Sequence, residues 1–108
     1  MPPCWWLLWW IEQMAIAERD VVAYFKRKVA DLGGETRKLA YEGRNGATDQ
    51  LVLLPGRHCV VELKRPGEKP RVVQAREHER LRAAGFDVFV LSTLDEVDEW
   101  YWAQRVRL

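Results

Sequence analysis

Glu62 and Lys64 stand two residues apart within an otherwise apolar run, His58–Lys64, with the sequence HCVVELK. Because alternate residues of a β-strand project to the same face, the carboxylate and the ammonium share one side, about 6.6–6.8 Å apart along the strand. Val61 and Leu63 then point to the opposite side, where a core is expected. The alternatives are an edge strand with a solvated polar face and a surface ion pair of little energetic value.

A second carboxylate, Asp49, opens the preceding apolar run, which has the sequence DQLVLL. Pro55-Gly56 separates the two runs and predicts a β-hairpin. If the hairpin loop has an even number of residues, Asp49 lies on the same face as Glu62 and nearly opposite it. Two carboxylates side by side repel each other unless a cation lies between them.

Glu18 is a third candidate, in a segment, 14–32, where apolar residues recur at helical spacing. On a helical wheel, Phe25 and Val29 lie within about 20° of Glu18, so it should point toward the core. A lone buried carboxylate costs several kcal/mol unless it is paired or bound to a metal. The alternatives are a partly exposed glutamate and one paired with a buried arginine.

Together, three inward carboxylates and a lysine should converge on one place. Carboxylate oxygens suit hard cations such as Mg²⁺ or Mn²⁺. A metal held by Asp49 and Glu62 could activate water and neutralise charge on a phosphate, while Lys64 orients that water or stabilises the developing negative charge. The residues therefore point to metal-assisted hydrolysis.

The elements that must position these residues follow from periodicity and turn signals. We expect helices at 14–32 and 71–84, strands at 36–41, 49–54, 58–64 and 86–91, and a last helix capped by Thr93 with Glu96 closing a capping box. Glycines at 33–34 and 85 should end the first two helices. A helix between two strands predicts a crossover and a mixed sheet, so the fold class is α/β.

The composition is that of one globular domain: 108 residues, 48% hydrophobic and 31% charged, with a net charge of +1. This balance neither requires nor excludes nucleic-acid binding, but basic residues dominate from Lys26 to Arg82 and Asp95 to Glu99 is acidic. Cys4 and Cys59 match no metal-ligand spacing, which favours a reducing, cytoplasmic location. The apolar run 4–11 is shorter than the roughly 20 residues of a membrane span.

The ordered set of motifs resembles the VRR-NUC domain (virus-type replication–repair nuclease) of the PD-(D/E)XK nuclease superfamily. It comprises Glu18, Gly46-Ala47-Thr48-Asp49, Glu62-Leu63-Lys64-Arg65-Pro66-Gly67 and Gln74, and similarity covers 17–100. The resemblance implies a restriction-endonuclease-like αβββαβ core, with a mixed sheet flanked by helices, in a single domain over 14–108. One departure is Thr48, where the family usually has proline.

The resemblance also implies roles for individual residues. Asp49 and Glu62 would be metal ligands for Mg²⁺ or Mn²⁺, with Glu18 assisting directly or through water and the main-chain carbonyl of Leu63 completing the shell. Lys64 would be the catalytic lysine. Gln74 would position Lys64, the water or the substrate; a surface glutamine is the alternative.

Six basic residues are expected around the site as phosphate contacts, with solvated surface charge as the alternative; they are Arg37, Lys38, Arg44, Arg65, Lys69 and Arg71. His58 and His78 are single histidines without partner spacing, and the sequence assigns neither a role.

The segment 1–13 is rich in tryptophan and is expected to extend the first helix. Trp5, Trp6 and Trp9 would face solvent there, which a monomer rarely tolerates, so we expect them to form a homodimer interface. A weak membrane-surface anchor is the rival interpretation, and a third is that Met14 is the natural start.

Two functions are compatible with these observations. The first is a metal-dependent DNA endonuclease acting as a homodimer on branched DNA such as four-way junctions, since small, often viral, members of the family are similar in size. A viral origin would place it in the host cytoplasm. The alternative is a non-cleaving DNA-binding or regulatory module on the same scaffold. A purely structural domain would leave three core-facing carboxylates unexplained.

Overall fold

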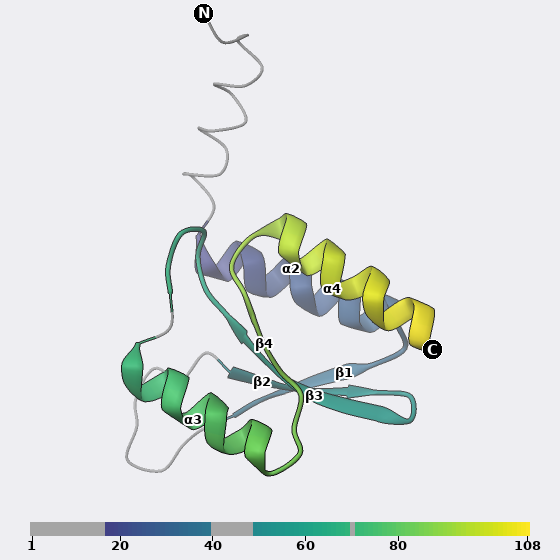
Figure 1. Ribbon diagram of the computed structural model, residues 1–108. Coiled ribbons are helices and arrows are strands. Elements are labelled where there is room, and N and C mark those ends of the chain that lie inside the picture. Colours follow the sequence, from purple (N-terminus) through teal and green to yellow (C-terminus); the bar gives the residue numbers. More distant parts are fainter. Residues whose placement is uncertain (1–16, 40–48, 70) are drawn as a thin grey trace, which may run out of the picture.

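The computed structural model describes residues 17–39, 49–69 and 71–108 (Figure 1). The tryptophan-rich segment, Met14 and Arg44 lie outside these residues, so what the sequence predicts for them remains a prediction. The elements follow the expected order and are α2 (Glu18–Asp31), β1 (Glu35–Lys38), β2 (Asp49–Leu54), β3 (Arg57–Leu63), α3 (Val72–Ala83), β4 (Val88–Leu91) and α4 (Leu94–Arg107).

The four strands form one mixed sheet in the order β1-β2-β3-β4. The pairs β1–β2 and β2–β3 are antiparallel, whereas β3 and β4 are parallel and are joined by α3 as a crossover. Helices α2 and α4 cover one face of the sheet and α3 lies on the other side (Figure 1). The α/β class, the αβββαβ core and the mixed sheet flanked by helices are confirmed.

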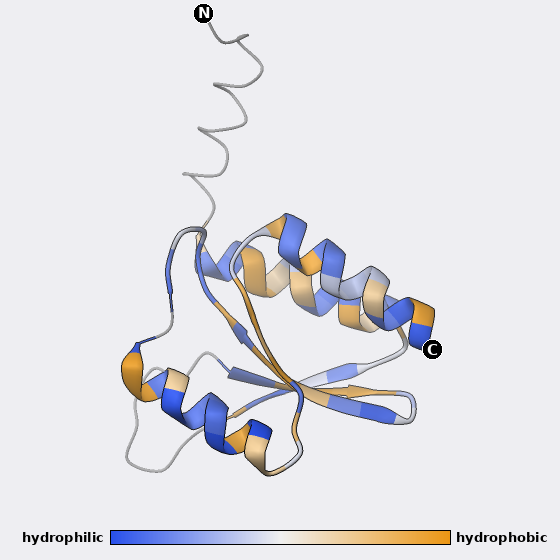
Figure 2. Cartoon of the chain, in the orientation of Figure 1, coloured by the Kyte–Doolittle hydropathy of each residue, from blue (hydrophilic) through white to orange (hydrophobic). Residues whose placement is uncertain are grey.

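The hydrophobic core lies between the sheet and the two helices α2 and α4, whose apolar faces point toward the sheet (Figure 2). The stripe expected on the first helix buries Phe25 and Val29, and the Phe25 ring packs against Trp100 with 4.9 Å between ring centroids. Val61 and Leu63 point into this core from β3. The other face carries the polar residues Asp49 and Glu62 beside apolar ones such as Val60.

The hairpin loop between β2 and β3 fixes which residues share that second face. Leu54 pairs with Arg57 across a two-residue turn, Pro55-Gly56, in which Gly56 has a φ of +71°. The loop is therefore even, and the register runs back to pair Asp49 with Glu62. A slip of one residue would turn Asp49 to the opposite face.

The first helix was expected to begin at 14, but α2 begins at Glu18, because Ala17 before it is extended (φ −90°, ψ 162°). The other helix ends match the expected signals. Gly33, with a φ of +78°, ends α2, and Thr93 caps α4 by accepting a hydrogen bond from the Glu96 backbone N–H. The second half of the expected capping box is not observed in the described part of the chain: the Glu96 carboxylate accepts instead from the Ser92 hydroxyl at 3.0 Å. The first strand occupies Glu35–Lys38, shorter than expected at its end. Among the described helices, none has the length and apolar character needed to cross a membrane.

Candidate active site

Two carboxylates meet on the polar face of the sheet. Asp49 and Glu62 are cross-strand partners and are buried, with exposed fractions of 3% and 0%. Burial raises the pKa of the Glu62 carboxyl; the nearby Lys64 ammonium opposes that rise and the charge of Asp49 adds to it. Two adjacent carboxylates that are buried away from water need a compensating positive charge.

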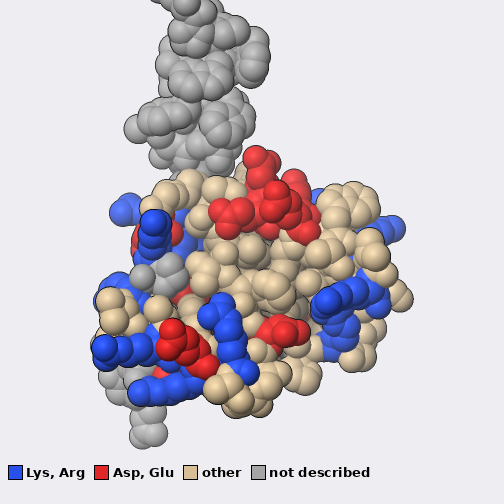
Figure 3. All heavy atoms as spheres, in the orientation of Figure 1, with Lys and Arg blue, Asp and Glu red and all other residues tan. Residues whose placement is uncertain are grey.

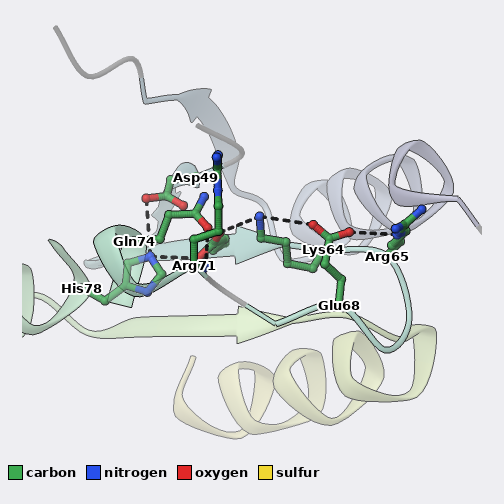
Figure 4. A network of polar contacts seen from close by, with 8 residues as sticks. Asp49, Lys64, Arg65, Glu68, Arg71, Gln74 and His78 are labelled. Atoms are coloured by element: carbon green, nitrogen blue, oxygen red, sulfur yellow. Dashed lines mark hydrogen bonds and ion pairs between the residues drawn. The ribbon is translucent and has the colours of Figure 1, made fainter. Parts of the chain in front are cut away.

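Lys64 supplies part of that charge. It follows β3 directly, and its backbone N–H donates to the Leu91 carbonyl at 3.0 Å, which continues the pairing with β4. Its Nζ lies 3.1 Å from Glu62 Oε1 and 3.7 Å from Glu68 Oε1, and the residue is only 5% exposed (Figure 4). The pair is buried, so neither the solvated edge strand nor the surface ion pair describes it.

His78 closes the other side of Glu62. It projects from α3, is 2% exposed, and places Nε2 3.0 Å from Glu62 Oε2 and 3.5 Å from Asp49 Oδ2 (Figure 4). Sequence reasoning assigned this histidine no role and missed it. The available signal was its spacing: it follows Gln74 by four residues and so shares that face of the helix.

These three side chains have the donor chemistry of a metal site. One ligand atom from each of Asp49, Glu62 and His78 lies within 4.8 Å of the other two. Neither oxygen of Glu62 nor Nε2 of His78 has a partner at hydrogen-bond geometry within the described part of the chain, although each stands at ion-pair distance from a neighbour. Buried carboxylate and imidazole donors in this arrangement suit a divalent cation.

Comparison with known proteins identifies the family. No protein-family model matches the sequence. A phage protein described as "Putative nuclease p44", from Acyrthosiphon pisum secondary endosymbiont phage 1, is 43% identical over 81 residues, which are 74% of this chain and 87% of that protein. A solved structure described as "VRR_NUC domain" is 48% identical, covers 76% of this chain and 90% of its own, and superposes with a TM-score of 0.69. The chain belongs to the VRR-NUC domain family.

The remaining residues that the resemblance singled out are distributed over this VRR-NUC domain. Gln74 is half-buried on α3, and its Oε1 accepts a hydrogen bond from the Arg71 backbone N–H at 3.0 Å. That bond caps the first turn of the helix, so the Gln74 amide is held at the N-terminal end of α3, one turn before His78 (Figure 4).

Glu18 and Leu63 relate to the site in different ways. Glu18 is half-buried in the first turn of α2 and lies outside the group formed by Asp49, Glu62 and His78. Leu63 is the residue between Glu62 and Lys64, and its side chain packs into the core on the opposite face. The metal-ligand roles of Glu18 and the Leu63 carbonyl stay predictions.

Basic residues of the loop after β3 and of α3 lie near one another, interspersed with acidic ones, and other basic residues lie elsewhere on the same view (Figure 3). Arg65, Lys69 and Arg71 are exposed and lie in or beside the loop between Lys64 and α3. In this structure Arg65 Nε is 2.9 Å from Glu68 Oε2, the same residue that approaches Lys64. The loop therefore links the exposed arginine to the buried lysine through one carboxylate.

The two basic residues of β1 separate. Arg37 pairs with Leu51, which shares the face of Asp49, whereas Lys38 pairs with Gln50 and so projects to the opposite face. Arg37 also contacts Glu35 at 2.7 Å. The register thus favours Arg37 over Lys38 as a residue on the side of the site.

Proposed function

We propose that this VRR-NUC domain is a divalent-metal-dependent DNA endonuclease that hydrolyses phosphodiester bonds. The observation that carries the proposal is the buried register pair of Asp49 and Glu62 with Lys64 Nζ 3.1 Å from Glu62. The family and the name of the phage relative support the nuclease part of the statement.

Each residue then has a chemical task. Asp49 and Glu62 hold the cation, which they can do because their oxygens are adjacent on paired strands. A bound divalent cation supplies Lewis acidity that lowers the pKa of water and offsets phosphate charge. Lys64 holds the attacking water or donates to the negative charge that develops on the phosphate, and burial of its ammonium strengthens that interaction.

The substrate and assembly are also part of the proposal. Arg65, Lys69 and Arg71 contact phosphates beside the site, which positions DNA without reading bases. The described part of one chain holds one carboxylate group with metal-ligand spacing, and cutting two strands of a junction needs two such sites. A homodimer with two-fold symmetry would supply them, which favours branched DNA as substrate.

The test is a cleavage assay on labelled linear duplex, single strand, flap and four-way junction, each with Mg²⁺, Mn²⁺ or EDTA. Asp49→Ala and Lys64→Ala should each lower the rate by about 10²-fold or more. Glu99→Ala is the matched control, since this exposed acid lies on α4, on the other face of the sheet, and its rate should equal wild type.

Three results would count against the proposal. Cleavage in the presence of EDTA would contradict the dependence on a metal. Equal cleavage of all substrates would contradict the preference for branched DNA. If the wild-type protein binds DNA but cuts no substrate, the alternative function, a non-cleaving binding module, would be favoured over the nuclease.

A further inference from the structure

His78 occupies a position that the proposed mechanism does not use. Helix α3 connects β3 to β4 and lies over the polar face of the sheet. It places this imidazole beside the carboxylates of Asp49 and Glu62. Nearly the whole side chain is buried. An imidazole placed there must serve either the fold or the chemistry of the two acids.

The donor distances match those between neighbouring ligands of one ion. Adjacent ligands of an octahedral cation with bonds of about 2.1 Å lie about 3.0 Å apart. In the structure Nε2 of His78 is 3.0 Å from Glu62 Oε2 and 3.5 Å from Asp49 Oδ2. Two of the three donor separations are thus close to that value, and all three donor atoms lie within 4.8 Å of one another, so they can converge on one cation.

The two oxygens of Glu62 face different neighbours. Lys64 lies at Oε1 and His78 lies at Oε2, on the side shared with Asp49. The lysine thus stands apart from the edge at which Glu62 Oε2, Asp49 and His78 approach one another. This separation distinguishes a metal-facing side of Glu62 from a lysine-facing side.

We propose that Nε2 of His78 is a direct ligand of the catalytic metal and makes the site select Mn²⁺ over Mg²⁺. The inference rests on the proposed function. An imidazole nitrogen is a ligand of transition metals, and affinity along that series begins at Mn²⁺, whereas Mg²⁺ prefers an all-oxygen shell with retained waters. The mixed donor set therefore favours Mn²⁺.

Calorimetric titration of Mn²⁺ and Mg²⁺ into wild type and His78→Gln tests the selectivity. The substitution should weaken Mn²⁺ binding by about tenfold or more and Mg²⁺ binding by clearly less. Asp49→Asn is the control and should weaken both ions alike. Equal losses in His78→Gln, or none, would overturn the proposal.

A second measurement needs no change at His78. The sequence has two histidines, and His58 is exposed, so His58→Gln leaves His78 as the one imidazole. With ¹⁵N-labelled histidine and no affinity tag, electron–nuclear double resonance of bound Mn²⁺ should detect coupling to a directly ligated nitrogen. A Mn²⁺ signal without that coupling would overturn His78 as a ligand.

The wild-type arms separate the two proposals. If wild type binds neither ion and cuts no DNA, the metal-dependent nuclease itself is wrong. If wild type cuts DNA in a metal-dependent way while His78→Gln keeps the same preference between Mn²⁺ and Mg²⁺, only the role of His78 is wrong.

Discussion

At the scale of single residues, the buried pair of Glu62 and Lys64 explains why a core strand carries charge. Each ion is stable there because the other offsets its lost hydration, and the pair as a whole adds little to stability. Removing one partner is therefore far more costly than removing both. In the proposed function, the strand carries these charges for the chemistry at its polar face.

We expect Lys64→Met to lower the free energy of unfolding by about 3–5 kcal/mol, because it leaves the Glu62 carboxylate buried without its lysine. The double variant Glu62→Gln/Lys64→Met should recover most of that loss and remain inactive. Urea unfolding followed by circular dichroism measures both. A double variant as unstable as the single one would show that the ion pair is not the source of the loss.

Cys59 gives a pH-dependent prediction. Burial raises the pKa of its thiol from an ordinary value of 9.0 to about 11. The folded protein keeps this proton where the unfolded chain loses it, so the thiol's contribution to stability is full below pH 9 and is lost as pH rises toward about 11.

Thiol labelling checks this in a Cys4→Ser background. Iodoacetamide should modify Cys59 slowly at pH 8 in buffer and completely in urea. The control is Cys59→Ser in the same background, whose stability should decline less between pH 9 and 11. Fast labelling of the folded protein would contradict the burial of this thiol.

At the scale of elements, the close approach of the turn after α2 to β2 depends on a glycine. A Cβ at Gly34 would lie 2.5 Å from the Leu53 carbonyl oxygen, whereas a Cβ at Gly56 would meet nothing within 4 Å. Gly34→Ala should therefore destabilise through overpacking by about 1–3 kcal/mol. Thermal unfolding measures it.

Gly56→Ala is the comparison, since it tests backbone conformation alone and should cost about 1–2 kcal/mol at a positive φ. Combining Gly34→Ala with Leu53→Ala should relieve nothing, because the obstructing atom is backbone. An unchanged melting temperature in Gly34→Ala would show that the helix and the strand can separate without loss.

Local signals in the sequence were sufficient to predict the mixed sheet and the pairing of Asp49 with Glu62. Pro55-Gly56 sets an even hairpin, and alternation along the strands then places Asp49 opposite Glu62. The position of His78 was not predictable in this way, because it depends on how the crossover helix is placed over the sheet. For Lys38 the expectation that it lies beside the site with Arg37 was wrong. The two residues are adjacent in sequence, but alternation along the strand places Lys38 on the opposite face.

At the scale of the whole molecule, charge is unevenly distributed. The basic residues of the loop after β3 and of α3 lie apart from the acidic first turn of α4, which contains Asp95 and Glu96 (Figure 3). Local groups of basic residues can attract DNA electrostatically despite a net charge of only +1. In the proposed function, DNA is oriented on each chain by these basic residues, and a second chain supplies the site that cuts the other strand.

The tryptophan-rich segment is our candidate for joining those chains. We expect the full-length protein to be a dimer and the variant Trp5→Ser/Trp6→Ser/Trp9→Ser to be a monomer, because aromatic side chains anchor protein interfaces. Light scattering at several concentrations measures the mass of each. Trp102→Ser is the matched control, since Trp102 is an exposed tryptophan on α4, and it should remain dimeric.

If the dimer is also the cutting unit, the triple variant should nick one strand of a four-way junction without paired incision. A full-length monomer that still makes paired cuts would contradict both the interface and the need for two sites.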